Sequence, residues 1–107
     1  KEVPMMTTEE LAAIIARAAS AALLRIGRIY QEQGLFHHAL TTYLKIVACY
    51  PESQEAPVAV DGLRAIAGAF EGKRHFHTAM SVYDRMERAV RFHRWNGHQL
   101  TPEGGIL

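Results

Sequence analysis

The stretch LLRIGRIYQEQGLFHHALTTYLKIVACYP, residues 23–51, decides the fold of this 107-residue chain. Its apolar residues recur every three or four positions on both sides of Gly34, which is the pattern of two amphipathic helices. Glycine commonly ends a helix in the left-handed conformation, and a Tyr50-Pro51 pair stops a helix from continuing. We therefore predict a helical hairpin with its turn at Gly34 and its second helix over about 35–50.

The first helix of this hairpin extends far upstream, to about residue 8. Thr7-Thr8-Glu9-Glu10 has the form of a capping box, and no proline interrupts the chain from Leu11 to Tyr50. The first half of the helix is rich in alanine, which permits close approach of a second helix. We expect one long helix over about 8–33, preceded by a loose N-terminal arm at 1–7.

A second helical pair follows, over about 54–71 and 74–94. Ser53 is placed to cap its first helix, Gly72 to turn the chain, and Asn96-Gly97 to end its second helix. No β-strand pattern of useful length is present. We predict an all-α fold of about four helices in two antiparallel hairpins, a domain over 8–95 and a tail over 96–107. The expected inner faces of this pair are Val58, Val60, Leu63, Ile66, Ala67 and Phe70, then Phe76, Ala79, Met80, Val82, Tyr83, Met86 and Val90.

The two hairpins correspond to each other at an offset of 40 residues. Apolar and aromatic positions coincide throughout, and a repeat of this length indicates stacked helical hairpins. The matching series are Leu23, Ile26, Tyr30, Phe36, His37, Ala39, Tyr43 and Ile46, and Leu63, Ile66, Phe70, Phe76, His77, Ala79, Tyr83 and Met86.

The first copy resembles the tetratricopeptide repeat family. Residues 23–51 supply Leu23, Ile26-Gly27, Tyr30, Ala39, Tyr43 and Pro51 at that family's spacings. The second copy departs from the pattern, with Ala67 in place of the glycine and Arg91 in place of the proline. The resemblance covers about 20–94, with repeats over 20–52 and 60–94. The segment over 50–70 is similar to the longer repeats of bacterial envelope-assembly lipoproteins.

This resemblance implies a right-handed α-solenoid whose first helices line a concave groove. Such a groove binds an extended or helical segment of another protein, so the implied role is a scaffold or adaptor rather than an enzyme. Two arginines in one groove can bind a carboxylate in bidentate fashion. The groove positions implied in this chain are Leu24, Arg28, Gln31, Asp61, Arg64 and Glu71.

Self-association is an alternative function. Two repeats are fewer than the three or so that a repeat array usually needs for stability. This shortage of repeats leads us to expect a fragment of a longer array or an oligomer, and the start at Lys1 is likewise expected of a processed protein or a fragment. The early part of the first helix is apolar around much of its circumference, and the residues expected to pair there are Leu11, Ile14, Ile15, Ala18 and Ala22.

Nucleic acid is a further alternative, ranked below protein partners. Formal net charge is only +1, but residues 73–95 carry six basic and two acidic side chains. Arg85, Arg88, Arg91 and Arg94 recur at helical spacing beside Phe92 and Trp95, which suits phosphates and bases. Residues 69–88 also resemble pentatricopeptide RNA-binding repeats.

Catalytic, metal and cofactor sites find no support in the sequence. His37 and His38 are adjacent on a helix and diverge, as do His75 and His77, so we expect surface histidines and no metal. Cys49, the only cysteine, is expected to be a small buried apolar residue rather than a nucleophile. No apolar stretch reaches the roughly 18 residues of a membrane span. The compartment, cytoplasmic or periplasmic, stays open.

Overall fold

The computed structural model describes residues 5–99, with side chains described through Arg91. It consists of four helices: α1 (Thr8–Glu32), α2 (Phe36–Cys49), α3 (Glu55–Gly72) and α4 (Phe76–Gln99). Within these residues there is no β-strand, so the predicted all-α class is confirmed. None of the described helices is long and apolar enough to cross a membrane.

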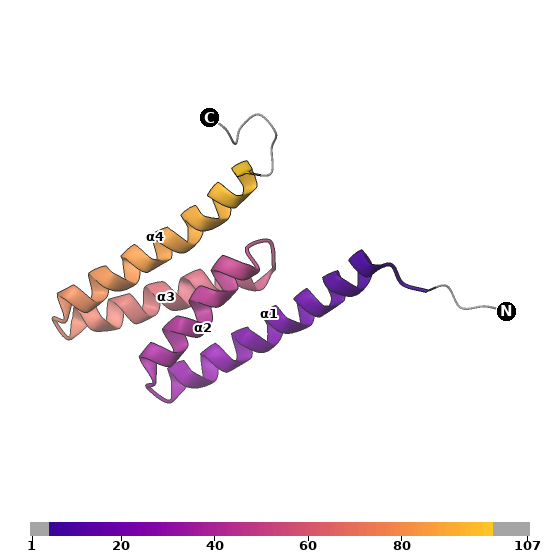
Figure 1. Cartoon of the computed structure of the whole chain (residues 1–107). Coiled ribbons are helices and arrows are strands. Elements are labelled where there is room, and N and C mark those ends of the chain that lie inside the picture. Colours follow the sequence, from indigo (N-terminus) through magenta and orange to yellow (C-terminus); the bar gives the residue numbers. More distant parts are fainter. Residues whose placement is uncertain (1–4, 100–107) are drawn as a thin grey trace.

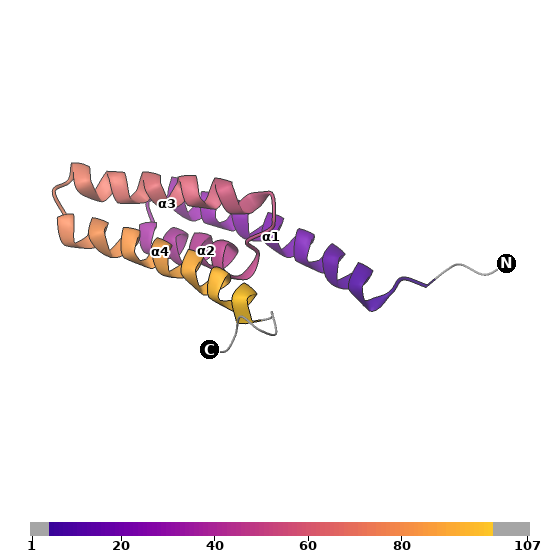
Figure 2. The same cartoon turned by 90° about the horizontal axis from the view of Figure 1, so that it is seen from above.

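The helices form two antiparallel hairpins that pack side by side (Figure 1). α1 contacts α2 and α3 contacts α4, while α1 also contacts α3 and α2 also contacts α4. Seen from above, α1 and α3 therefore form one layer and α2 and α4 the other (Figure 2). α2 and α3 lie in the middle of this network, since each of them packs against all three other helices.

The core is built around α2 and α3, because the apolar stripe of each meets all three other helices. Tyr43 and Ile46 of α2 and Leu63 and Ile66 of α3 are almost completely inaccessible to solvent. Transfer of such side chains from water contributes about 1.5–3 kcal/mol each. The remaining buried members of the cluster are Ala39, Leu40, Val47, Ala56, Ala59, Ala67, Val82 and Ala89.

The first half of α1 projects beyond this core (Figure 1). Its start is the predicted capping box, in which the Glu10 N–H donates to Thr7 Oγ1 at 3.0 Å and the Thr7 N–H donates to Glu10 Oε1 at 2.9 Å. Beyond the cap, large apolar side chains are exposed, since no other described helix covers them. Leu11 is 47%, Ile14 40% and Ile15 64% exposed.

The two hairpin turns share one backbone geometry. In the first, Gly34 adopts the predicted left-handed conformation at φ 77°, and the Leu35 N–H donates to the Tyr30 carbonyl at 2.9 Å. In the second, Arg74 takes this conformation at φ 64°, and the His75 N–H donates to the Phe70 carbonyl at 2.8 Å. The prediction that Gly72 turns the chain is wrong, because that glycine is still the last residue of α3.

Two other predicted helix limits differ from the structure. Ser53 does not cap α3; its hydroxyl donates instead to the Tyr50 carbonyl at 2.7 Å, and the helix begins at Glu55. α4 continues through Asn96-Gly97 to Gln99, because a glycine tolerated within a helix does not by itself end it. Residues 100–107 of the expected tail and 1–4 of the expected arm lie outside the described residues.

Several positions predicted to be buried are exposed, most of them on α4. Phe76, Met80, Tyr83 and Val90 are 54%, 68%, 41% and 43% exposed. On α3, the predicted inner residue Val58 is 36% exposed. The sequence pattern locates the apolar side of each helix correctly, but on α4 no further helix within the described residues covers that side.

Candidate protein-binding surface

Tyr43 of α2 lies buried beneath the surface formed by α1 and α3. Its ring lies between two glycines, one from each helix: a Cβ placed on Gly27 would lie 2.6 Å from Tyr43 Cε1, and one placed on Gly62 2.6 Å from Cε2. These distances leave no room for a methyl group on either side. The sequence indicated Gly27 as a small residue at a helix contact. It did not indicate Gly62, although glycine within a helix often marks a close packing contact.

A polar cluster surrounds the outer end of this ring. The Tyr43 hydroxyl donates to Gln31 Oε1 at 2.6 Å. Burial raises the pKa of Tyr43 above its ordinary value of 10.0, with the positive charge of Arg28 opposing and the negative charge of Glu32 adding to that shift. Two of the predicted groove residues, Arg28 and Gln31, therefore lie together at the end of Tyr43.

An equivalent cluster recurs 40 residues later in the second hairpin. Glu71, the 40-residue equivalent of Gln31, lies close enough to Tyr83 to act on it electrostatically. Desolvation comes first among the causes that raise the pKa of Tyr83; Glu71 raises it further, and Arg64 lowers it. Arg64 also approaches Asp61 at 3.8 Å. Two more predicted groove residues, Arg64 and Glu71, thus lie near Tyr83 instead of Tyr43, and Asp61 lies beside Arg64.

The six predicted groove residues accordingly divide into two similar groups, one in each hairpin. Leu24 is half-buried and packs against the core, so it contributes little surface. Arg28 is exposed and forms no ion pair within residues 5–91. At the position equivalent to Arg28, α3 carries Gly68, whose added Cβ would meet nothing within 4 Å. At Gly68, therefore, no described side chain covers the outer surface of α3.

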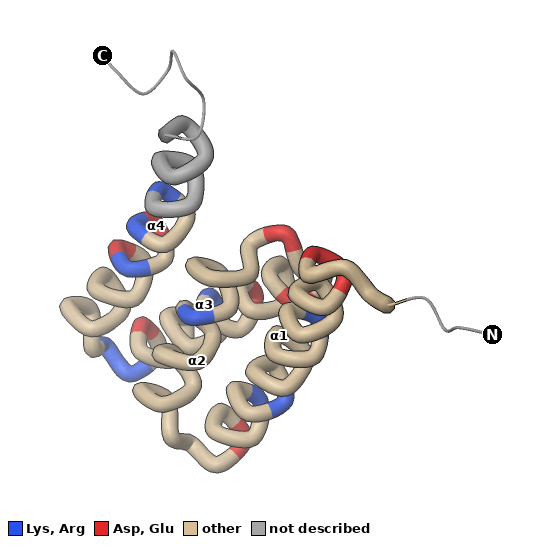
Figure 3. The backbone as a smooth tube through the Cα atoms, turned by 45° about the vertical axis from the view of Figure 1, so that its right-hand side comes forward, with Lys and Arg blue, Asp and Glu red and all other residues tan. Residues whose placement is uncertain are grey.

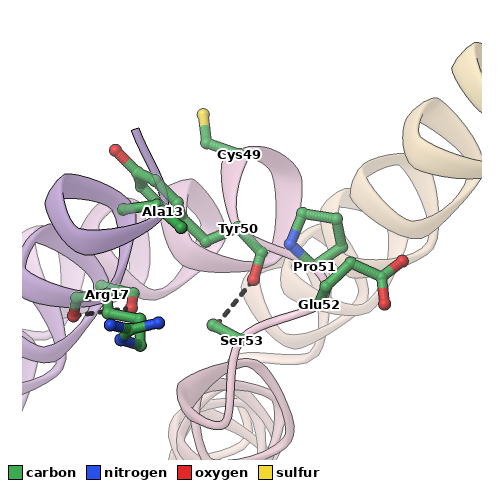
Figure 4. Close-up of a pocket in the computed structure, with 9 residues that line it drawn as sticks. Ala13, Arg17, Cys49, Tyr50, Pro51, Glu52 and Ser53 are labelled. Atoms are coloured by element: carbon green, nitrogen blue, oxygen red, sulfur yellow. Dashed lines mark hydrogen bonds between the residues drawn. The ribbon is translucent and has the colours of Figure 1, made fainter. Parts of the chain in front are cut away.

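A hydrogen bond also joins α1 to α3 at the N-terminal end of α3. The Ser20 side chain, which is completely buried, donates to Glu55 Oε1 at 3.0 Å. Next to it, the first half of α1 and the α2–α3 loop enclose a hollow of about 310 Å³, lined by Ala13, Arg17, Tyr50 and Pro51 among others (Figure 4). The expectation that Cys49 is buried is wrong: it ends α2 at the rim of this hollow and is exposed.

The basic stripe of α4 is largely neutralised within its own helix. Arg88 pairs with Asp84 at 2.8 Å and Arg91 with Glu87 at 2.9 Å. Basic and acidic positions consequently lie next to each other along the helix (Figure 3). The side chains of Phe92, Arg94 and Trp95, which belong to the predicted nucleic-acid stripe, are outside the described residues.

The histidines of the hairpin turns contact aromatic rings. His37 and His75 both lie beside Phe70, with ring centroids 5.9 and 6.3 Å apart, and His38 lies 5.1 Å from Tyr30. Among the described residues, no three histidine, cysteine or acidic side chains gather to form a metal-binding group. These histidines therefore pack against aromatic rings near the hairpin turns.

Comparison with known proteins adds no family to this description. No family model, no curated protein and no solved structure matches the chain. The candidate surface is therefore defined by the chain's own geometry, which has three parts. They are the buried Tyr43 between two glycines, the exposed Arg28, and the second group formed by Arg64, Glu71 and Tyr83.

Proposed function

We propose that this chain is a protein-binding module of the tetratricopeptide type, which holds an acidic segment of a partner protein against α1 and α3. The 40-residue correspondence of Tyr43 and Gln31 with Tyr83 and Glu71 supports this type, because in each hairpin the tyrosine of the second helix lies near the equivalent residue of the first. The packing of α1 on α3 and α2 on α4 agrees with a solenoid of stacked hairpins.

The observation that carries this proposal is an exposed arginine next to open helix surface. Arg28 of α1 has no ion-pair partner within residues 5–91, and the equivalent position of the neighbouring α3 is Gly68, with empty space above it. A partner backbone can approach α3 there while Arg28 binds an acidic side chain. Arg64 supplies a second cation on α3, one helical turn before Gly68. Its ion pair with Asp61 is long, at 3.8 Å, and exposed.

Peptide selection tests the proposal directly. A random peptide library displayed on phage is selected on the immobilised protein, and enriched peptides are synthesised for titration. We expect enriched peptides to contain acidic residues and to bind less tightly as salt rises. Arg28→Glu should weaken binding on the order of 10- to 100-fold, the range for losing a hydrogen bond to a charged group.

The matched control is Lys45→Glu. Lys45 is an exposed cation on α2, in the other layer of the fold, so reversing its charge changes net charge equally without touching α1 or α3. Circular dichroism establishes that both variants retain their helices. Failure to enrich any acidic peptide, or an equal loss of affinity in Lys45→Glu, contradicts the proposed site.

A further inference from the structure

The open end of the molecule has a surface shaped to receive another helix. Its apolar part is made by α3 and α4 with one residue of α2, and encloses a hollow of about 380 Å³. We call it the end face. Its members are Val47, Val60, Leu63, Arg64, Tyr83, Met86, Glu87 and Val90.

The end face is the 40-residue equivalent of a surface that α3 already covers in the first hairpin. Tyr83 corresponds to Tyr43, Met86 to Ile46 and Val90 to Tyr50. Tyr43 is 2% exposed because α3 lies over it, whereas Tyr83 is 41% exposed. The chain thus carries the same helix-accepting surface twice and covers it once.

The helix that covers the first surface shows what the second requires. α3 places Gly62 against the ring of Tyr43, and the preceding residues of the same face, Ala56 and Ala59, are small and buried. Small side chains three residues apart let the helix backbone approach the aromatic ring closely. A helix that covers Tyr83 must likewise combine small residues with larger ones that fill the hollow beside Met86 and Val90.

The projecting half of α1 has this composition. We call residues 8–19 the arm. Its alanines at 12, 13, 16, 18 and 19 place a small side chain within one turn of each large apolar residue. The large ones, Leu11, Ile14 and Ile15, are 40–64% exposed. An arm with exposed apolar side chains and an end face with an open hollow are therefore present on one chain.

Charge is compatible with the same pairing. The arm begins with Glu9 and Glu10, both exposed. The charged side chains of the end face are Arg64 and Glu87; Glu87 is paired with Arg91 at 2.9 Å, whereas the pair of Arg64 with Asp61 is long, at 3.8 Å, and exposed. Arg64 is therefore the cation of the end face that the acidic beginning of an arm can pair with.

We propose that the arm of one copy of this chain covers the end face of a second copy. The arm then covers Tyr83 as α3 covers Tyr43. The contact joins two different surfaces, so it is heterologous and assembles copies head to tail. It goes beyond the proposed partner groove and does not depend on it.

Sedimentation of the whole chain across a range of concentrations tests this contact with two variants. Ile15→Glu disrupts the arm and Val90→Glu disrupts the end face; both residues are exposed, so neither change disturbs the core. We expect the mass of the wild type to rise with concentration. Each glutamate should weaken association on the order of 30-fold or more, because a charge would be buried without a partner.

Mixing the two variants gives the decisive result. Ile15→Glu keeps an intact end face and Val90→Glu keeps an intact arm, so an equimolar mixture should form a one-to-one dimer although neither variant assembles alone. Met80→Glu on α4, outside the end face, and Ile29→Glu on α1, outside the arm, are matched controls that should assemble like the wild type.

Four outcomes would overturn the proposal. A wild type that stays monomeric at every concentration means that the end face takes some other occupant. Assembly of Val90→Glu alone points to arm–arm pairing, and assembly of Ile15→Glu alone to face–face pairing. A mixture that stays monomeric excludes the arm and the end face as partners. Circular dichroism confirms that each variant is folded, and the wild-type result stands without any variant.

Discussion

The two hairpins place similar residues at equivalent positions, but those residues differ in burial. In the first, Tyr43 is buried between Gly27 and Gly62 and donates to a neutral amide. In the second, the equivalent Tyr83 is 41% exposed and lies near the carboxylate of Glu71. The difference arises from what lies beyond each hairpin, since α3 covers the first and no described helix covers the second. Burial of a repeated position is thus a property of its neighbour, not of the repeat itself.

The largest expected difference is between truncating the two tyrosines. Tyr43→Ala should destabilise the fold by about 3–5 kcal/mol, as for large aromatic residues removed from a core. Tyr83→Ala should stay within about 1 kcal/mol, since much of its ring already faces water. Urea unfolding followed by circular dichroism measures both. Similar losses in the two variants would mean that the hairpins are equally closed in solution.

The next largest effect should come from replacing the helical glycines with alanine, which distinguishes the two packed against Tyr43 from the open one. Gly27→Ala and Gly62→Ala place a Cβ 2.6 Å from the Tyr43 ring, so each should cost about 1–3 kcal/mol net of its better helix propensity. Gly68→Ala, which meets nothing within 4 Å, should instead stabilise by about 0.5–1 kcal/mol.

Repeating Gly27→Ala in a Tyr43→Leu protein tests whether the Tyr43 ring causes the loss of stability. If the Tyr43 ring is the obstacle, the cost of Gly27→Ala should shrink in a Tyr43→Leu protein, and a double-mutant cycle gives the coupling. An unchanged cost in that background would remove the ring as the explanation. Denaturant midpoints of the four proteins are sufficient for this measurement.

Substituting the left-handed residue should lower the stability of the fold at the first turn and raise it at the second. Gly34→Ala should destabilise by about 1 kcal/mol, because a Cβ is disfavoured at φ 77°. Arg74→Gly should stabilise by a similar amount of about 1 kcal/mol or less, since it relieves the same strain at φ 64°. Thermal unfolding midpoints report both, and a lower midpoint for Arg74→Gly would show that the arginine side chain contributes more than its backbone costs.

The smallest difference concerns alkaline pH. Both tyrosines have a raised pKa in the folded chain, so the folded state holds their protons more tightly than the unfolded state does. Their contribution is fully present below pH 10.0, the ordinary value, and is lost as pH rises through the folded pKa. Tyr43→Phe should flatten the decline of the unfolding midpoint above pH 10 more than Tyr83→Phe, because only Tyr43 must ionise inside the core. An identical decline in both variants would contradict this.

Local features were predictable where the chemistry is local. The capping box at Thr7 and Glu10, the left-handed Gly34 and the stop near Tyr50 depend on residues close in sequence, and all three are confirmed. The second turn was predicted at the wrong residue because glycine was taken as the marker. In the structure, tertiary packing of α3 on α4 holds Arg74 in a conformation that its side chain disfavours.

The candidate surface was predicted less well than the helices. Arg28, Arg64 and Glu71 were selected as one groove, but the structure divides them between the ends of two tyrosines. Gly62 and Gly68 have opposite environments, one against a ring and the other in open space, and nothing in their immediate sequence distinguishes them. Such differences depend on which helix lies opposite, and that is a long-range property.

By itself, the sequence determined the four helices, the sides of each that are apolar and the 40-residue correspondence, because periodicity and capping act within a few residues. Only the tertiary structure decided which apolar sides are covered. Tyr43 and Tyr83 have the same position in their hairpins, yet one is a core residue and the other a surface residue. The reason is geometric: a helix has two flanks, and burial of either requires a second element at that place.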